Sequence, residues 1–156
     1  MQFYPIGIIK TPFRSTEGMP IQPSGATEVE GTIEIYQDFV EGLKDLDGFS
    51  HVILLYHLHE SKGFQLMVTP FMDDKQRGVF ATRAPKRANP IGLSVVKLVK
   101  IENNILHIEN IDVLHDTPLL DIKPFIPDVD SPNVTGLGWL QGKSGKMKDK
   151  KSDNRF

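Results

Sequence analysis

The chain has 156 residues, a net charge of −2 and no cysteine. This length predicts one domain with a substantial core, and the missing cysteine excludes disulfides, thiolate metal sites and a cysteine nucleophile. A membrane-spanning helix is excluded because no run of about 18 apolar residues is present, and we expect no signal peptide at the N-terminus. A cysteine-free chain of this kind is typical of the reducing cytosol, so we expect a cytoplasmic protein.

The elements predicted in chain order are mostly short strands. The candidate strands cover residues 3–9, 31–36, 49–59, 65–69, 78–82, 93–102, 105–109, 111–114 and 119–122. Residues 38–46 have apolar side chains at i, i+4 and i+7 and predict a short helix, and Asn103–Asn104 indicates a hairpin turn. Eight or nine short strands with one or two short helices predict a mainly β fold, a compact antiparallel β-barrel within residues 1–140.

Two segments depart from the alternation of apolar and polar residues that is typical of half-buried strands. Residues 15–29 are rich in Gly, Pro, Ser and Thr, and a loop of this length in a small domain is often functional. Val52 to Tyr56 are apolar on both faces, as in a strand at the centre of a packed barrel or sandwich.

The C-terminal residues 141–156 form a basic tail. The six cations of residues 143–156 stand against only Asp149 and Asp153; they are Lys143, Lys146, Lys148, Lys150, Lys151 and Arg155. With few large apolar groups, this tail is predicted to be disordered. It is either a solvated end or an electrostatic arm for a polyanion such as RNA, and the local sequence does not separate the two.

Common catalytic motifs are absent from the sequence. We find no phosphate-binding glycine loop, no HExxH and no GxSxG. His57 and His59 would point the same way on a strand and could bind a metal with Glu60, His107 or His115. Because an HxH pair alone is a weak signal, we favour structural histidines and expect no metal.

Polar residues gather in two further stretches. Residues 78–94 hold Arg83, Lys86 and Arg87 between two prolines that stiffen the backbone, which is typical of a loop that fixes side chains in place; a plain solvated connection is the alternative. In residues 112–124, Asp121 and Lys123 alternate on a predicted strand and could pair.

These stretches resemble the TsaA-like family, the TrmO-type tRNA methyltransferases. The resemblance covers about residues 3–130. It rests on the segments IGIIKTPF (6–13), MPIQP (19–23), GLKDLDGFSHVILLYHLH (42–59), RGVFATRAPKRANPIGLSVVKL (77–98) and IDVLHDTPLLDIKPFIP (111–127).

The resemblance implies a homodimeric β-barrel that binds S-adenosylmethionine. It implies methylation of N6 of threonylcarbamoyladenosine beside the tRNA anticodon, with no membrane or DNA partner. The cofactor-binding residues it implies are Gln22, Pro23, Ser24, His59, Glu60, Arg83, Leu93, Asp112, Val113, Leu114, His115, Asp116 and Thr117.

The chemistry of methyl transfer adds further candidates. The acceptor nitrogen must lose a proton, so a carboxylate or imidazole is expected nearby; the catalytic candidates are Asp121, His59 and Lys123, with His115 a further imidazole. A base in a single-stranded loop suits basic and stacking contacts, and the RNA-binding candidates are Lys86, Arg87, Asn89 and Lys123.

Three features differ from the pattern of the resembled family. His115–Asp116–Thr117 stands where DGT is common, Glu60 stands where Gln is common, and the second domain of longer members is replaced by the basic tail. The alternative function is therefore a barrel that binds S-adenosylmethionine or another small ligand, as a sensor or a methyltransferase of another substrate, without tRNA activity. Since the tail lies outside every family motif, we expect its removal to leave cofactor affinity unchanged.

Overall fold

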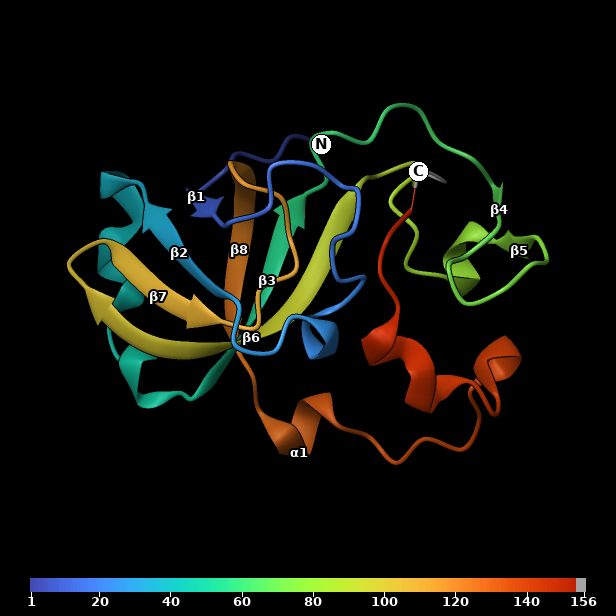
Figure 1. Cartoon of the computed structure of the whole chain (residues 1–156). Helices are drawn as coiled ribbons and strands as arrows, with labels where there is room; N and C mark the ends of the chain where they lie inside the picture. The colour runs from blue at the N-terminus through green and yellow to red at the C-terminus, as the bar shows by residue number, and fades with distance from the viewer. Residues whose placement is uncertain (154–156) are drawn as a thin grey trace.

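Six antiparallel strands close into a barrel in the computed structural model, which describes residues 1–153, with only the backbone at 144, 147 and 148 (Figure 1). The barrel strands are β1 (Gly7–Lys10), β2 (Glu30–Ile35), β3 (His51–His57), β6 (Ile91–Glu102), β7 (Ile105–Glu109) and β8 (Thr117–Pro124). Their order is β1-β2-β7-β6-β3-β8, and β8 pairs with β1 to close the ring. The predicted mainly β antiparallel barrel is confirmed.

The barrel core is filled by the inward side chains of each strand. On β3, Val52, Leu54 and Tyr56 point inward and are almost fully buried, while Ile53 and Leu55 point outward and remain partly exposed. The two apolar faces of this strand therefore have different roles, and only one of them belongs to the core.

Three predicted elements, two strands and the short helix, take a different form. A two-stranded ribbon of β4 (Met67–Val68) and β5 (Arg77–Gly78), followed by the 3-10 turn η4 (Val79–Ala81), replaces two of the predicted strands. Residues 38–46 form the 3-10 turns η2 (Gln37–Leu43) and η3 (Leu46–Gly48), because Asp45 at φ 65° interrupts a continuous helix.

Residues 111–114, predicted as a strand, are a loop. The side chains of Ile111 and Val113 are buried, but the amide of Ile111 points at the carbonyl of Val29 and not at a paired strand. By contrast, the predicted β6–β7 hairpin is confirmed, and Asn103 takes the left-handed conformation (φ 56°) that the turn requires.

The chain after the barrel continues through short helical turns into the basic tail of residues 141–156, for which the composition predicts disorder. It passes through α1 (Pro127–Asp130), η5 (Gly138–Leu140) and η6 (Ser144–Asp149), and Lys151 then forms an isolated β-bridge with Pro20. In Figure 1 this red segment runs beside the β4–β5 ribbon. Arg155 and the side chain of Lys148 lie outside the described residues. Within residues 1–153, no helix is long and apolar enough to cross a membrane.

One glycine fixes the position of an inward aromatic ring. Gly92 on β6 lies opposite Tyr56 on β3, and a Cβ at position 92 would overlap the Tyr56 ring, with Cζ only 2.5 Å away. The missing side chain lets the ring of Tyr56 fold across β6 and reach the Ser94 hydroxyl.

We expect Gly92→Ala to lower the free energy of unfolding by about 1–3 kcal/mol, because the added methyl overpacks a buried ring. Urea unfolding measures this loss. Gly42→Ala is the matched control, since a Cβ there meets nothing within 4 Å, and an equal effect of the two substitutions would contradict the packing argument.

Candidate functional site

The largest concentration of polar groups around a cavity lies where β3 ends and β8 begins. This pocket has a volume of about 370 Å³ and is walled by four segments: the loop at 16–21, the end of β3 with residues 58–62, the loop at 83–86 and residues 112–117. Phe71, Ser152 and Asp153 complete the lining. The long loop at 15–29 thus contributes directly to a cavity.

The pocket combines an apolar lining with charges of both signs. Its apolar side chains include Met19, Ile21, Leu58 and Phe71. Its charged side chains are Lys62, Arg83 and Lys86 against Glu60, Asp112 and Asp153. Apolar walls with a few convergent charges are typical of small-molecule sites, and this balance suits a ligand that carries both positive and negative groups.

A chain of three hydrogen-bonded side chains forms part of the pocket wall. The Ser94 hydroxyl donates to Asp112 Oδ1 at 2.6 Å, and the Tyr56 hydroxyl lies 2.9 Å from Ser94 Oγ. Because the only proton of Ser94 goes to the carboxylate, Tyr56 is the donor of the second bond. β3 and β6 together hold the Asp112 carboxylate in one orientation.

The electrostatics of this chain are set by burial. Burial raises the pKa of Asp112 to about 6, although the hydrogen bond from Ser94 and the nearby Arg83 oppose the rise. Burial, together with the Asp112 charge, also raises the pKa of Tyr56 well above its usual value. Asp112 is therefore a carboxylate whose charge is poorly stabilised by the protein itself.

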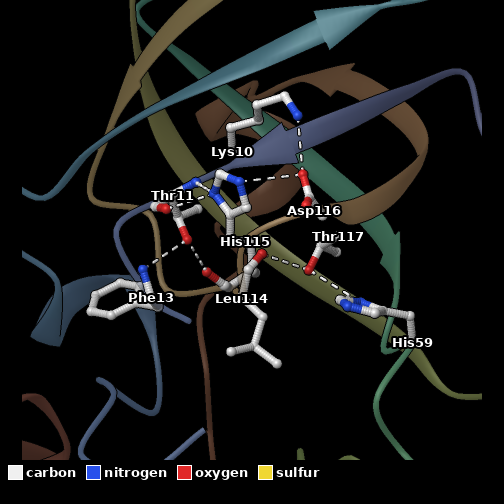
Figure 2. Close-up of polar contacts among 9 residues, drawn as sticks. Lys10, Thr11, Phe13, His59, Leu114, His115, Asp116 and Thr117 are labelled. Carbon is white, nitrogen blue, oxygen red and sulfur yellow. Dashed lines mark hydrogen bonds and ion pairs between the residues drawn. The ribbon is translucent and has the colours of Figure 1, made fainter. Parts of the chain in front are cut away.

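The loop that carries Asp112 is fastened to the end of β1, as Figure 2 shows. Thr11 Oγ1 donates to the Val113 carbonyl at 2.8 Å, and the His115 Nδ1 lies 2.8 Å from the Thr11 carbonyl. Lys10 Nζ bonds Asp116 Oδ1 at 3.0 Å. The side chains of His115 and Asp116 thus hold the loop in place and turn away from the pocket.

The other end of this loop meets the histidine that follows β3. The Thr117 hydroxyl donates to the Leu114 carbonyl at 2.7 Å and lies 3.5 Å from His59 Nδ1 (Figure 2). His59 Nε2 lies 3.6 Å from Glu60 Oε1. His59 is consequently positioned at the pocket wall between two polar neighbours.

The pocket brings together seven of the predicted cofactor-binding residues: His59, Glu60, Arg83, Asp112, Val113, Leu114 and Thr117. Gln22 lines an adjacent cavity of about 420 Å³, which shares Ile21, Phe71 and Arg83 with the pocket. Pro23 and Ser24 begin the turn η1 (Pro23–Gly25) and line neither cavity. Leu93 points outward from β6 and is 45% exposed.

Two of the three catalytic candidates lie away from the pocket. Asp121 and Lys123 form an ion pair at 2.8 Å on the outer face of β8, and this pairing raises the pKa of Lys123. Only His59 among the three lines the pocket. Within one chain the structure does not bring the Asp121–Lys123 pair to His59.

The predicted RNA-binding residues of the 78–94 loop have different environments. Lys86 lines the pocket and Asn89 is exposed. Arg87 turns inward: its Nη1 donates to the carbonyls of Val79 and Thr82 at 3.0 and 2.9 Å. The guanidinium of Arg87 therefore crosslinks the backbone within the 78–94 loop. The two prolines of this loop predict a stiff backbone, and these hydrogen bonds agree with it.

The pocket also contains residues that sequence reasoning missed. Tyr56 lines the pocket and was not predicted as a site residue. Its partner Ser94 lies behind the lining and was indicated only as the last residue of the RANPIGLS stretch, although a serine at an inward position of an apolar strand is a usable signal once the β3–β6 register is known. Ser152 and Asp153 carry no local signal. In the described part of the chain, no three His, Asp or Glu side chains gather closely enough to hold a metal ion.

Comparisons with known proteins match the part of the chain that supplies most of the pocket lining. A family model described as the tRNA-methyltransferase O N-terminal domain matches residues 8–131. A relative from Pyrococcus abyssi, named "Probable S-adenosyl-L-methionine-binding protein", is 49% identical over 154 residues, which is 99% of this chain and 84% of the relative. The human "tRNA (adenine(37)-N6)-methyltransferase" is 35% identical over 82% of this chain.

Solved structures agree in fold. The crystal structure of TrmO from Pseudomonas aeruginosa superposes with a TM-score of 0.75 at 38% identity and covers 89% of this chain. This chain spans only 62% of that protein and 31% of the human relative.

The raised pKa of Asp112 makes stability depend on pH. Below about pH 4 the group is protonated in both states, whereas above about pH 6 the folded protein must hold a buried charge, so stability falls as pH rises through this window. We expect Asp112→Asn to gain about 2–3 kcal/mol in unfolding free energy relative to the parent chain between pH 4 and 7. Urea titrations across this range measure the difference. A difference that does not change with pH would contradict the assignment.

Proposed function

The chain belongs to the family of the tRNA-methyltransferase O N-terminal domain, and from this premise we propose that it is an S-adenosylmethionine-dependent methyltransferase acting on tRNA. The acceptor is N6 of threonylcarbamoyladenosine beside the anticodon. The single observation that carries this proposal is the charged pocket at the end of β3, whose lining comes mostly from the residues that match the family.

The residues of the pocket fit the proposed cofactor. S-adenosylmethionine carries a carboxylate, an ammonium and a sulfonium, so its site has to offer charges of both signs. Arg83 or Lys86 would bind the carboxylate. Asp112, whose own surroundings stabilise its negative charge poorly, would accept a hydrogen bond from the ammonium group of the cofactor. Relatives from three archaea carry S-adenosylmethionine binding in their names.

The protein's own contribution to catalysis is to position groups and to accept a proton. When bound, the cofactor would supply an electrophilic methyl group. His59, held between Thr117 and Glu60, is the titratable side chain of the pocket best placed to take the proton from the acceptor nitrogen. Asp121 and Lys123 lie on the outer face of the barrel, so they would serve only the pocket of a second copy.

A tRNA acceptor is supported by the surface beside the pocket. Phe80 is 77% exposed and lines the adjacent cavity that shares Arg83 with the pocket. Exposed aromatic rings next to cations suit unstacked bases of single-stranded loops. The names of the human and rat relatives point to the same substrate class, and a tRNA substrate fits a cytoplasmic enzyme.

The proposed assembly is a homodimer formed through the outer apolar face of β3 and β6. Leu55 pairs with Leu93, and Ile53 pairs with Val95, so that four apolar side chains share one outward face. Leu93 is 45% exposed and Ile53 and Leu55 are partly exposed. A second copy of the chain would remove this face from water.

A second candidate function is binding of S-adenosylmethionine or a similar small ligand without tRNA activity. It is favoured by one observation: the relatives from Pyrococcus abyssi and Archaeoglobus fulgidus are named for S-adenosylmethionine binding and not for a tRNA reaction. The pocket alone would support this function equally well, and tRNA methylation separates the two.

We expect Asp112→Asn to weaken S-adenosylmethionine binding roughly tenfold to a hundredfold, because a charge-assisted hydrogen bond is lost. Affinity of the parent chain should rise between pH 5 and 7 as the carboxylate ionises, and this dependence should vanish in the variant. Isothermal calorimetry measures both. Asp128→Asn, on exposed α1, is the control, and equal affinity of the two variants would count against the assigned role of Asp112.

Incubating the protein with labelled S-adenosylmethionine and tRNA from cells lacking this gene tests the reaction. We expect one added methyl group on threonylcarbamoyladenosine, detected by nucleoside mass spectrometry, and a large loss of product in His59→Ala. Cofactor binding without any methylated nucleoside would favour the second candidate function.

We expect light scattering at micromolar concentration to give a dimer for the parent chain and a monomer for Leu93→Lys, because a charge would be buried at the interface. Val129→Lys is the control, since Val129 is 73% exposed on α1. A monomeric parent chain would refute the homodimer.

A further inference from the structure

The segment formed by residues 138–153 lies outside the part of the chain that matches the family, yet it ends at the pocket. We call this segment the strap. Hydrogen bonds attach it at two places, the β4–β5 ribbon and the loop at 16–20, and between them η6 packs beside η1. Figure 1 shows it in red, beside the ribbon and ending near the loop.

The first attachment is built on Trp139. Its indole Nε1 donates to the Ala81 carbonyl at 2.7 Å. The Arg77 guanidinium and the Lys143 ammonium lie 5.6 and 5.8 Å from the ring centroid. A hydrogen-bonded indole that also interacts with two cations has a defined position, so the strap begins at a fixed point on the ribbon.

A buried carboxylate joins the two cations of this attachment. The side chain of Asp73 is only 4% exposed, and its oxygens lie 2.6 Å from Arg77 Nη2 and 3.2 Å from Lys143 Nζ. The hydrogen bond from Arg77 holds the pKa of Asp73 well below its usual range. Lys143, counted as a tail cation in the sequence, is therefore committed to a contact within the protein.

The second attachment is a short stretch of backbone pairing. The Ser152 amide donates to the Met19 carbonyl at 2.8 Å, and the Gly18 amide donates to the Ser152 carbonyl at 3.1 Å. Lys151 bridges to Pro20, and the Ser152 hydroxyl bonds the Thr16 carbonyl. This pairing places Ser152 and Asp153 in the pocket lining.

We propose that the strap is a cofactor-binding element: Trp139 anchors it, and Ser152 and Asp153 form one wall of the S-adenosylmethionine pocket. The inference rests on the proposed function for the identity of the ligand. Asp153 adds a third acidic side chain to a lining that holds Glu60 and Asp112, on the wall that the strap supplies. This proposal replaces the expectation that removal of the C-terminal tail leaves cofactor affinity unchanged.

The energetic consequence follows from the length of the strap. Ordering its residues costs conformational entropy. This cost is offset by the Trp139 contacts, by the Ser152 backbone pairing and, between them, by the packing of η6 beside η1. If losing one attachment leaves about a tenth of the molecules with the strap in place, the apparent Kd for the cofactor rises about tenfold. The barrel core, which the strap does not enter, should keep its stability.

The test compares full-length variants by calorimetry with S-adenosylmethionine. Trp139→Ala removes the anchor, and Ser152→Pro removes the amide that pairs with Met19. We expect each to raise Kd about tenfold while the thermal unfolding midpoint stays close to that of the parent chain. The matched control is Lys146→Ala, an exposed residue of the strap, for which we expect an unchanged Kd. As a second readout, addition of the cofactor should slow hydrogen exchange at the Ser152 and Gly18 amides.

The outcomes separate the two proposals. If the parent chain does not bind the cofactor, the proposed function fails and the strap proposal fails with it. If the parent chain binds but Trp139→Ala and Ser152→Pro bind equally well, the strap proposal alone is overturned. Weaker tRNA binding by these variants with unchanged cofactor affinity would likewise overturn it and would make the segment an RNA-binding arm.

Discussion

The register of β3 between β6 and β8 is the constraint on which the whole site depends. It places Tyr56 opposite Gly92 and two pairs away from Leu54–Ser94, so that the tyrosine hydroxyl reaches Ser94 and Ser94 reaches Asp112. A slip of one residue would exchange the inward and outward faces of β3. It would move Tyr56 out of the barrel and bring Leu55 into it, and Ser94 would lose the hydrogen bond from Tyr56 that helps to orient it toward Asp112.

Much of this arrangement could be predicted from the sequence, but only where the signal is local. The doubly apolar 52–56 stretch and Asn103–Asn104 indicated a central strand and a hairpin, and the family resemblance indicated His59, Arg83 and Asp112. The Tyr56–Ser94 contact depends on a cross-strand register that no local pattern encodes. Residues 111–114 look like a strand because Ile111 and Val113 are buried, yet their backbone pairs with loops. The strap is equally hidden, because its contacts join residues far apart in the sequence.

Asp116 shows how a departure from the family pattern is accommodated. It stands where glycine is common in the resembled family and takes the left-handed conformation, φ 60°, that favours glycine. Aspartate tolerates this region better than most residues, and here its carboxylate also pairs with Lys10 while the neighbouring His115 contacts Thr11. The turn is thus retained, and the contacts that fix it also fix Asp112 and Thr117 at the pocket.

The stability of the molecule is distributed unevenly around the pocket. One wall belongs to the barrel, whose core joins thirteen buried residues, whereas the β4–β5 ribbon has a cluster of only Val68, Val79 and Ala84. Elements with so few buried contacts open more readily than a barrel core. The strap is anchored on this weaker element and pairs with the 16–20 loop, so its hydrogen-bonded attachments are made outside the barrel core. A pocket with one rigid wall and one wall of low local stability can admit a charged ligand and then close on it. The ligand's contacts would supply the ordering energy that the ribbon and the strap lack by themselves.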